Sequence, residues 1–273
     1  MIAILMATYN GERFLREQID SILTQTYKDW HLYIHDDGSK DATPAILKEY
    51  EQEHPDLITV MDYPPQGGPL QNFMSLLERI DAPYYMFSDQ DDVWLADKIE
   101  SEMNAMKANE KDGLPVIVAT DLIVVDEHLK TIAPSLWQIA GIYPELITSF
   151  DDMAANTVVT GCTMLFNATL RKVVIPVSPH ATMHDAWMAC CLLKNNGTMV
   201  CLHDKTILYR QHGDNTLGAQ DVSSKSIWSR LRSSWQINRA HYAMLDDMGY
   251  GSWIKYISHK IKYRKGISKL HNA

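Results

Sequence analysis

The sequence predicts an α/β fold in which a largely parallel central sheet is flanked by helices on both faces. Short, continuously apolar runs alternate with segments whose apolar residues recur at helical spacing. Strands that are buried on both faces read as continuous apolar runs, and their alternation with helices indicates a parallel sheet. Polar turns follow the first, second and fourth apolar runs, and ligands bind beyond the carboxyl ends of strands in such sheets.

The first half of the chain follows this alternation closely. Pro44 suits the first turn of the second helix, since its fixed backbone angle is already helical. Strands are expected at 2–7, 31–35, 57–61 and 84–87, and helices at 12–23, 41–50, 73–80 and 97–108.

The second half alternates less cleanly. Strands are expected at 116–120, 122–125, 157–166, 199–202 and 206–209, and a helix at 184–194. Gly, Ser and Asp cluster at 217–226, which is typical of a joint between domains. The chain is therefore divided into a main domain, 1–217, and a helical C-terminal extension, 218–273.

Composition places the chain among ordinary globular proteins. It has 273 residues, of which 46% are hydrophobic and 22% charged. The longest apolar run, Ala186 to Leu193, is far shorter than the roughly 20 residues of a membrane helix. No signal peptide is visible, and the four cysteines lack zinc or redox spacing, so reduced thiols and a cytoplasmic location are expected.

Charge is unevenly distributed. From Asp221 onward, ten Lys and Arg face three Asp, which gives +7; the net charge of −9 then leaves −16 for the rest. The acidic body argues against nucleic acid as a partner. The basic extension could lie peripherally on the inner face of the plasma membrane or could simply cap the core. Its apolar residues include Ile227, Trp228, Leu231, Trp235, Trp253 and Ile254.

An acidic cluster follows the fourth expected strand. Asp89, Asp91 and Asp92 stand in the sequence Ser-Asp-Gln-Asp-Asp-Val-Trp at 88–94. Like charges this close raise one another's pKa unless a positive charge is near, and Mg²⁺ or Mn²⁺ would supply that charge. A solvated acidic turn is the alternative. The turns at 8–10 and 36–38 end neighbouring strands and should meet this cluster at one edge of the sheet, which favours a binding site.

The motifs taken together resemble inverting family 2 glycosyltransferases. They are Ala-Thr-Tyr-Asn-Gly at 7–11, Gln-Thr-Tyr at 25–27, Asp-Asp-Gly-Ser at 36–39, Asp-Gln-Asp-Asp at 89–92, His-Asp-Ala-Trp at 184–187 and Arg-Gln-His-Gly at 210–213. The resemblance implies a GT-A fold with a nucleotide-sugar half, 1–110, and an acceptor half, 111–217. It also implies a nucleoside-diphosphate sugar donor and a divalent metal. The segment 88–94 is similar to the rhamnosyltransferase-like branch.

The resemblance also implies roles for the donor-side residues. Asp91 would bind the metal with help from His212, and Asp89 would lie near the donor ribose. A metal at that point would offset the charge that develops on the leaving diphosphate. The other expected donor contacts are Thr8, Tyr9, Asn10, Asp37, Gln90 and Asp92. Thr8 and Asn10 could instead cap the following helix, and Asp36 could hold its turn.

Asp185 is the catalytic base that the resemblance implies. A carboxylate opposite the leaving group would take the proton of the acceptor hydroxyl. Its position at a helix start would equally suit a merely structural carboxylate. Many relatives carry Glu-Asp where this chain has His184 and Asp185, so the role depends on the alignment of that motif. Gly161 falls where the acceptor-side loop would lie, and a close backbone approach would explain the glycine.

The predicted function is metal-dependent transfer of a sugar, with dTDP-rhamnose as a candidate donor, to a hydroxyl of a glycan or glycolipid acceptor at the cell surface. A non-catalytic member that binds nucleotide sugar or a partner is one alternative. A sugar nucleotidyltransferase is another, but it would need a glycine-rich, basic loop after the first strand, and 9–13 is not such a loop.

Overall fold

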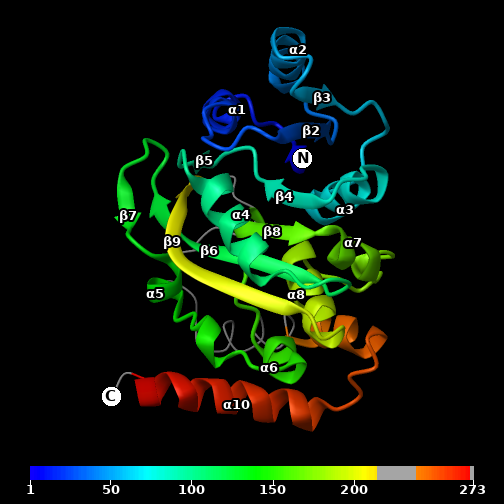
Figure 1. Cartoon of the computed structure of the whole chain (residues 1–273), viewed down its shortest axis with the longest axis vertical. Helices are drawn as coiled ribbons and strands as arrows, with labels where there is room; N and C mark the ends of the chain where they lie inside the picture. The colour runs from blue at the N-terminus through cyan, green and yellow to red at the C-terminus, as the bar shows by residue number, and fades with distance from the viewer. Residues whose placement is uncertain (214–237, 271–273) are drawn as a thin grey trace.

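The computed structural model describes residues 1–213 and 238–270. A nine-stranded sheet runs through the molecule in the order β3-β2-β1-β4-β8-β6-β9-β5, with β7 paired to β6 (Figure 1). The predicted joint at 217–226 and the tail residues Ile227, Trp228, Leu231 and Trp235 lie outside the described residues.

The N-terminal half of the sheet is parallel, as predicted. β1 (Ile2–Thr8) lies between β2 (Trp30–Asp36) and β4 (Tyr84–Ser88), and β3 (Ile58–Val60) pairs with β2, all in parallel register. The helices that connect these strands are α1 (Leu15–Leu23), α2 (Thr43–Glu53) and α3 (Pro69–Arg79). Because the strands point the same way, the turns after β1, β2 and β4 meet at one edge.

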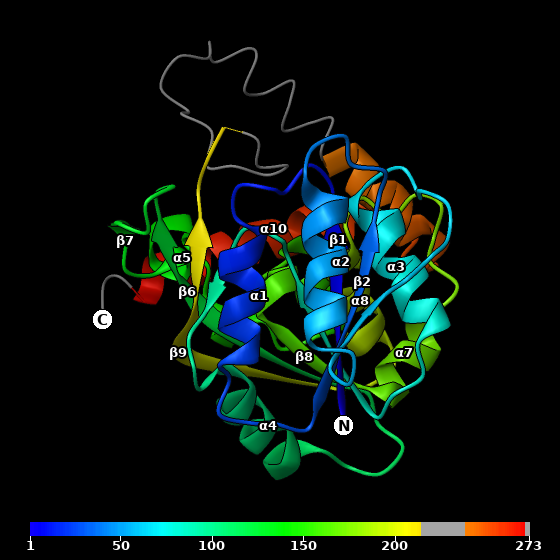
Figure 2. The same ribbon diagram turned by 90° about the horizontal axis from the view of Figure 1, so that it is seen from above.

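Each face of the sheet has its own core, because alternate strand residues point to opposite sides. Ala3 and Leu5 pack with α3, whereas Ile2, Ile4 and Met6 pack with α1. The first core also includes α6 (Phe150–Ala155), α7 (Ala168–Val174) and α8 (His184–Lys194), and the second includes α4 (Lys98–Asn109). Helices therefore cover both faces of the sheet (Figure 2).

The C-terminal half of the sheet is mixed. β8 (Met164–Asn167) lies between β4 and β6 (Val116–Val125) and is antiparallel to both. β9 (Thr198–Arg210) is parallel to β6, and the two-residue β5 (Val93–Trp94) is antiparallel to β9. The remaining elements of this half are β7 (Thr131–Ala133), α5 (Leu136–Ala140), η1 (Pro144–Leu146) and η2 (Gly161–Thr163).

Three strand predictions differ from the structure. The two strands expected at 199–202 and 206–209 are one strand, because the register against β6 jumps from Leu202 to Lys205 and the polar residues between them form a bulge. The pair expected at 116–125 is likewise one strand with shifts in register. The apolar run 157–166 forms a strand only from Met164, and its earlier part is a buried turn.

Two helices make up most of the described part of the C-terminal extension. Residues 238–247 are helical, and α10 (Trp253–Leu270) packs across α6 at the edge of the molecule (Figure 1). Within the described residues no helix has the length and apolar character needed to span a bilayer.

Candidate active site

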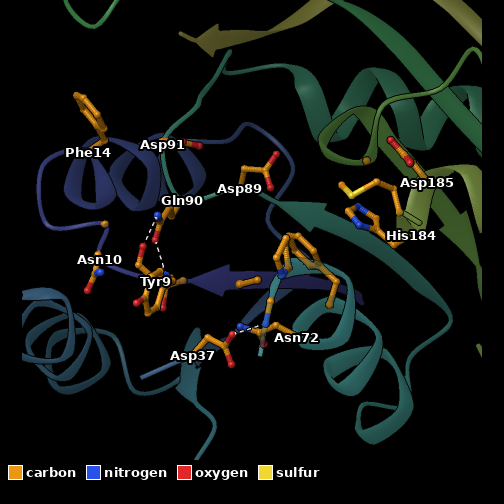
Figure 3. A pocket seen from close by; sticks show the side chains of 18 of the residues that line it. Tyr9, Asn10, Phe14, Asp37, Asn72, Asp89, Gln90, Asp91, His184 and Asp185 are labelled. Carbon is orange, nitrogen blue, oxygen red and sulfur yellow. Dashed lines mark hydrogen bonds between the residues drawn. The ribbon is translucent and has the colours of Figure 1, made fainter. Parts of the chain in front are cut away.

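A cavity of about 890 Å³ opens at the carboxyl ends of β1, β2 and β4. Its walls also include the start of α8 and the end of β9 (Figure 3). Nine of the ten predicted site residues line it: Thr8, Tyr9, Asn10, Asp37, Asp89, Gln90, Asp91, Asp185 and His212. The tenth, Asp92, is fully buried beneath the acidic loop.

The acidic loop holds three carboxylates close together. Burial and the charges of Asp91 and Asp185 raise the pKa of Asp89 to about 7. Burial and the charges of Asp91 and Asp89 also raise the pKa of Asp92 well above its ordinary value. One ligand atom from each of Asp89, Asp92 and Cys162 lies within 4.8 Å of the others.

The carboxylates of the acidic loop, Asp89, Asp91 and Asp92, fit a hard divalent cation. The buried Cys162 thiol does not, because burial and the neighbouring carboxylates raise its pKa well above the ordinary value. Carboxylate oxygens are the ligands that Mg²⁺ and Mn²⁺ prefer. Asp92 Oδ2 is buried without a hydrogen-bond partner among the described residues, although the Cys162 thiol lies beside the Asp92 carboxylate. A cation here would also compensate the mutual repulsion that raises these pKa values.

His212 and Asp91, the two predicted metal ligands, are in direct contact. His212 Nε2 lies 2.8 Å from Asp91 Oδ2, although Asp91 follows β4 and His212 follows β9. The imidazole also packs against Phe14, with ring centroids 4.9 Å apart. The structure therefore brings the two residues together at one wall of the cavity.

Arg210 supports this wall from inside the protein, and the sequence reasoning assigned it no role of its own. Its side chain is only 1% exposed. Nε donates to the Asp91 carbonyl at 2.8 Å, Nη1 donates to the Glu127 carbonyl at 2.7 Å, and Nη2 pairs with Glu17. Its backbone N–H donates to Asp92 Oδ1 at 3.3 Å. The signal that could have found it is an arginine two residues before His212 at the end of an apolar strand.

Gln90 joins the acidic loop to the turn after β1. Its amide accepts from Tyr9 N–H and donates to the Tyr9 carbonyl, both at 2.9 Å (Figure 3). A Cβ on Gly11 would lie 2.3 Å from Gln90 Oε1, so the glycine makes room for this pair of bonds. Gln90 thus lines the cavity while its side-chain amide is bonded to the Tyr9 backbone, and the Tyr9 side chain stays exposed.

Thr8 and Asn10 hold the turns after β1 and β2 together. Thr8 Oγ1 donates to Asp36 Oδ1 at 3.0 Å, and Asn10 Oδ1 accepts from Lys40 N–H at 2.8 Å. Neither caps α1, whose N-cap is Phe14 without a side-chain bond, so the capping alternative is wrong. Asp36 does hold its own turn, since Oδ2 accepts from Ser39 N–H at 2.9 Å.

Asp37 lies at the entrance of the cavity on the β2 side. Its carboxylate accepts from the N–H groups of Gln66, Gly67 and Gly68, the last at 2.7 Å. Gly67 and Gly68 have φ of 86° and 138°, which favour glycine, so the sequence at this loop allows its amides to converge on one carboxylate. Asp37 therefore fixes the loop that borders the cavity.

Asp185 faces the acidic loop from the other side of the cavity (Figure 3). It stands in the first turn of α8, where the helix dipole stabilises its negative charge. Its neighbour His184 is buried between Phe73 and Phe87, and burial lowers the pKa of that imidazole. His184 is therefore neutral and adds no charge beside Asp185. A Cβ on Gly161 would lie 2.1 Å from His184 Nε2, which confirms the close approach expected at this glycine.

Comparison with known proteins decides the family. Residues 3–174 match the sequence profile described as Glycosyl transferase family 2. The chain belongs to this family. It is 28% identical over 259 residues to the dTDP-rhamnosyl transferase RfbG of Shigella flexneri, covering 89% of this chain and 85% of that protein. It is 25% identical over 246 residues to the putative teichuronic acid biosynthesis glycosyltransferase TuaG of Bacillus subtilis, covering 89% and 90%.

Solved structures confirm the GT-A fold of this family 2 glycosyltransferase. The mannosyltransferase PcManGT of Pyrobaculum calidifontis, solved in complex with GDP-Man and Mn²⁺, superposes with a TM-score of 0.63. That match covers 97% of this chain and 69% of PcManGT at 14% sequence identity. The predictions of the family, of the fold and of a glycosyltransferase activity are thus confirmed.

Proposed function

We propose that this family 2 glycosyltransferase is a metal-dependent, inverting enzyme that transfers a sugar from a nucleoside diphosphate to a hydroxyl of a surface glycan or glycolipid. One observation carries the proposal: a single cavity places Asp89 and Asp91 on one side and Asp185 on the other. Inverting transfer needs this arrangement, because the leaving group departs on one side of the sugar while a base activates the acceptor on the other.

Asp185 is the proposed general base. Its carboxylate would take the proton of the acceptor hydroxyl as the oxygen bonds to the anomeric carbon and the bond from that carbon to the diphosphate breaks. Asp185 Oδ1 already accepts the N–H of Ala186 at 2.6 Å, which holds the carboxylate in place. His184 beside it is neutral, because burial lowers the pKa of its imidazole.

Asp91, Asp89 and His212 would hold Mn²⁺ or Mg²⁺. A bound cation supplies Lewis-acid stabilisation of the charge on the leaving diphosphate. The presence of Mn²⁺ and GDP-Man in the PcManGT complex supports a metal and a nucleotide sugar here as well. Arg210 and Gln90 would fix the loop that carries these ligands, and the exposed Tyr9 ring is free to stack on a nucleoside base.

The proposed donor is dTDP-rhamnose, on the strength of the name of RfbG. The name of TuaG supports a glycan acceptor. The full set of carboxylates in the cavity speaks against a non-catalytic member, and the turn at 9–13 still lacks the basic, glycine-rich loop of a nucleotidyltransferase. The cytoplasmic location stays a prediction.

Thermal unfolding with a panel of nucleoside diphosphates and their sugars, with and without Mn²⁺, tests the proposal. A ligand at 100 times its Kd adds about 2.7 kcal/mol of stability if it binds only the folded state. We expect stabilisation by dTDP and dTDP-rhamnose that needs Mn²⁺ and is lost in Asp91→Asn. The matched control is Asp112→Asn, which makes the same substitution at an exposed aspartate. A response to uridine or guanosine diphosphate alone would contradict the donor, and no response to any of them would contradict the donor site.

The stereochemical outcome is tested separately. NMR of the product formed from the preferred donor should show inversion at the anomeric carbon. Retention would contradict the role given to Asp185.

A further inference from the structure

The outer face of α10 carries an apolar stripe. Ile254, Ile257 and Ile261 recur at helical spacing on one side of the helix and are 83%, 37% and 49% exposed. Figure 1 shows α10 as an outer element, with α6 along its inner side. Exposed isoleucines in such a row are unusual for a surface that faces only water.

The opposite face of the same helix is fixed to the protein. Tyr256 is buried in the core that includes α6 and α8, and the Tyr263 hydroxyl accepts from Tyr143 N–H at 2.8 Å. Lys262 and His259 each contact Asp152 Oδ1 at 2.8 Å, and Lys255 pairs with Asp151. One face of α10 therefore caps the core while the other presents the isoleucine stripe. The two roles predicted for the tail, a cap on the core and a contact with a membrane surface, are compatible in α10.

Positive charge borders the stripe. α10 contains six Lys and Arg and no acidic residue, so with a total of −9 the rest of the chain carries −15. Arg264, Lys265 and Lys269 are exposed and form no ion pair with a described carboxylate, unlike Lys255 and Lys262. Lys260 instead packs over the buried Tyr256 ring, with Nζ 5.1 Å from the ring centroid. A groove of about 510 Å³ beside the helix is lined by Lys262, Lys265 and Lys269 together with Ile261, Leu146 and the carboxylate of Asp152.

We propose that α10 docks this protein on the surface of an anionic phospholipid bilayer. The isoleucine stripe would enter the boundary between headgroups and acyl chains, and the flanking cations would contact lipid phosphates. The acidic body would be repelled by the same surface, so the charge distribution selects the α10 face. A second copy of this chain fits less well, because self-docking would bring the cations of the two helices together.

Vesicle sedimentation of the full-length protein tests this docking independently of the transfer reaction. We expect binding to vesicles of phosphatidylcholine with about 30% phosphatidylglycerol, and little binding to phosphatidylcholine alone. Ile254→Ser/Ile257→Ser/Ile261→Ser should lower the partition coefficient at least about tenfold. The matched control is Ile132→Ser/Ile139→Ser, which changes two isoleucines that are 60% and 55% exposed elsewhere on the molecule.

Charge is tested by a second pair of variants. Lys265→Gln/Lys269→Gln should weaken binding to the anionic vesicles by about 30-fold, from roughly 1 kcal/mol per lysine near the surface. Lys48→Gln/Lys111→Gln removes two exposed lysines from the body and should leave binding unchanged. Each variant is first checked for an unaltered melting temperature; if the triple serine variant does not fold, Ile254→Ser alone provides the test.

Three results would overturn the proposal. The first is that the wild-type protein does not bind the anionic vesicles. The second is that the variants in α10 bind as well as their controls. The third is a dimer in sedimentation velocity that Ile254→Ser disrupts while vesicle binding is absent, which would make this face a protein interface.

Discussion

His212 Nε2 and Asp91 Oδ2 lie 2.8 Å apart although 121 positions separate the residues in the chain. The contact closes one wall of the cavity between the end of β9 and the acidic loop after β4. It pairs the nitrogen of an imidazole with a carboxylate oxygen, and both are ligand atoms that Mn²⁺ accepts. A metal at this wall would therefore depend on both ends of the contact.

Loss of either partner should weaken the binding of Mn²⁺. We expect His212→Gln and Asp91→Asn each to raise the Kd for Mn²⁺ at least about tenfold, since each removes one ligand atom of a small set. Titration calorimetry measures the change. His128→Gln is the control, because His128 is 81% exposed and lies away from the cavity. Equal affinities in His212→Gln and His128→Gln would remove His212 from the metal site.

Arg210→Lys should destabilise the protein and loosen the acidic loop. Lysine cannot reproduce the separate bonds to Asp91, Glu127 and Glu17, and it leaves two partly buried carbonyls without these donors. We expect the free energy of unfolding in urea to fall by about 2–4 kcal/mol. Arg16→Lys, which changes an exposed arginine paired with Glu49, should cost less than about 1 kcal/mol. A loss of the same size in both variants would contradict the supporting role of Arg210.

Gly11→Ala should weaken nucleotide binding by displacing Gln90. The new methyl group would lie 2.3 Å from Gln90 Oε1 and would break the two bonds to Tyr9. We expect about a tenfold rise in the Kd for the nucleoside diphosphate, measured by calorimetry. Gly213→Ala, where a Cβ meets no atom of the described residues within 4 Å, is the control.

A double-mutant cycle makes this prediction more specific. In a Gln90→Ala background the clash is gone, so Gly11→Ala should have little further effect on nucleotide affinity. Additive losses would show that Gly11 acts on the site through something other than Gln90.

Affinity for Mn²⁺ should rise with pH up to about 7. The folded pKa of Asp89 is about 7, above its ordinary value of 3.8, so the folded protein holds a proton there that the cation must displace below that pH. Without metal, the same shift makes the folded state most stable below the ordinary pKa, and that stability is lost as the pH rises toward 7. Calorimetry at several pH values tests the first statement. A flat profile from pH ~5 to ~8 would contradict it.

Asp185→Asn should strongly slow transfer while it preserves donor binding. The amide cannot take the acceptor proton, so kcat should fall by about 10²–10⁴-fold, whereas the Kd for the donor should change little. Steady-state kinetics and calorimetry separate the two effects, with Asp112→Asn as control. Weak donor binding with residual transfer would instead place Asp185 in the donor site.

Much of the site could be predicted from the sequence because it stands at strand ends. Asp37, Asp89 and Asp91 each follow an apolar run, and parallel strands bring their carboxyl ends to one edge. The contacts that support the site could not be predicted from the sequence in the same way. Asp92 is adjacent to Asp91 in the chain but points into the interior, where its Oδ1 accepts the backbone N–H of Arg210. Its direction depends on how β5 and β9 pair, and no local pattern contains that pairing.

The second half of the fold shows the same division. The sequence predicts one strand on either side of the polar residues 203–205, yet β9 continues through them because a bulge against β6 keeps the strand paired. β8 lies between β4 and β6 and is antiparallel to both. The segment that connects β6 to β8 is long and is not a single helical crossover. The periodicity of apolar residues indicates which face of a segment is buried, but it does not indicate which strand or helix lies beside that segment.

The sequence by itself determined the parallel N-terminal half, the family and nine of the residues that line the cavity. These follow from local patterns, since strand alternation, turn chemistry and motif order are properties of short segments. Only the tertiary structure decided that His212 meets Asp91, that Arg210 holds their loop, and that α10 anchors one face in the core while it presents isoleucines on the other. Each of these depends on contacts between segments far apart in the chain, and the energy of such contacts comes from packing and charge in three dimensions.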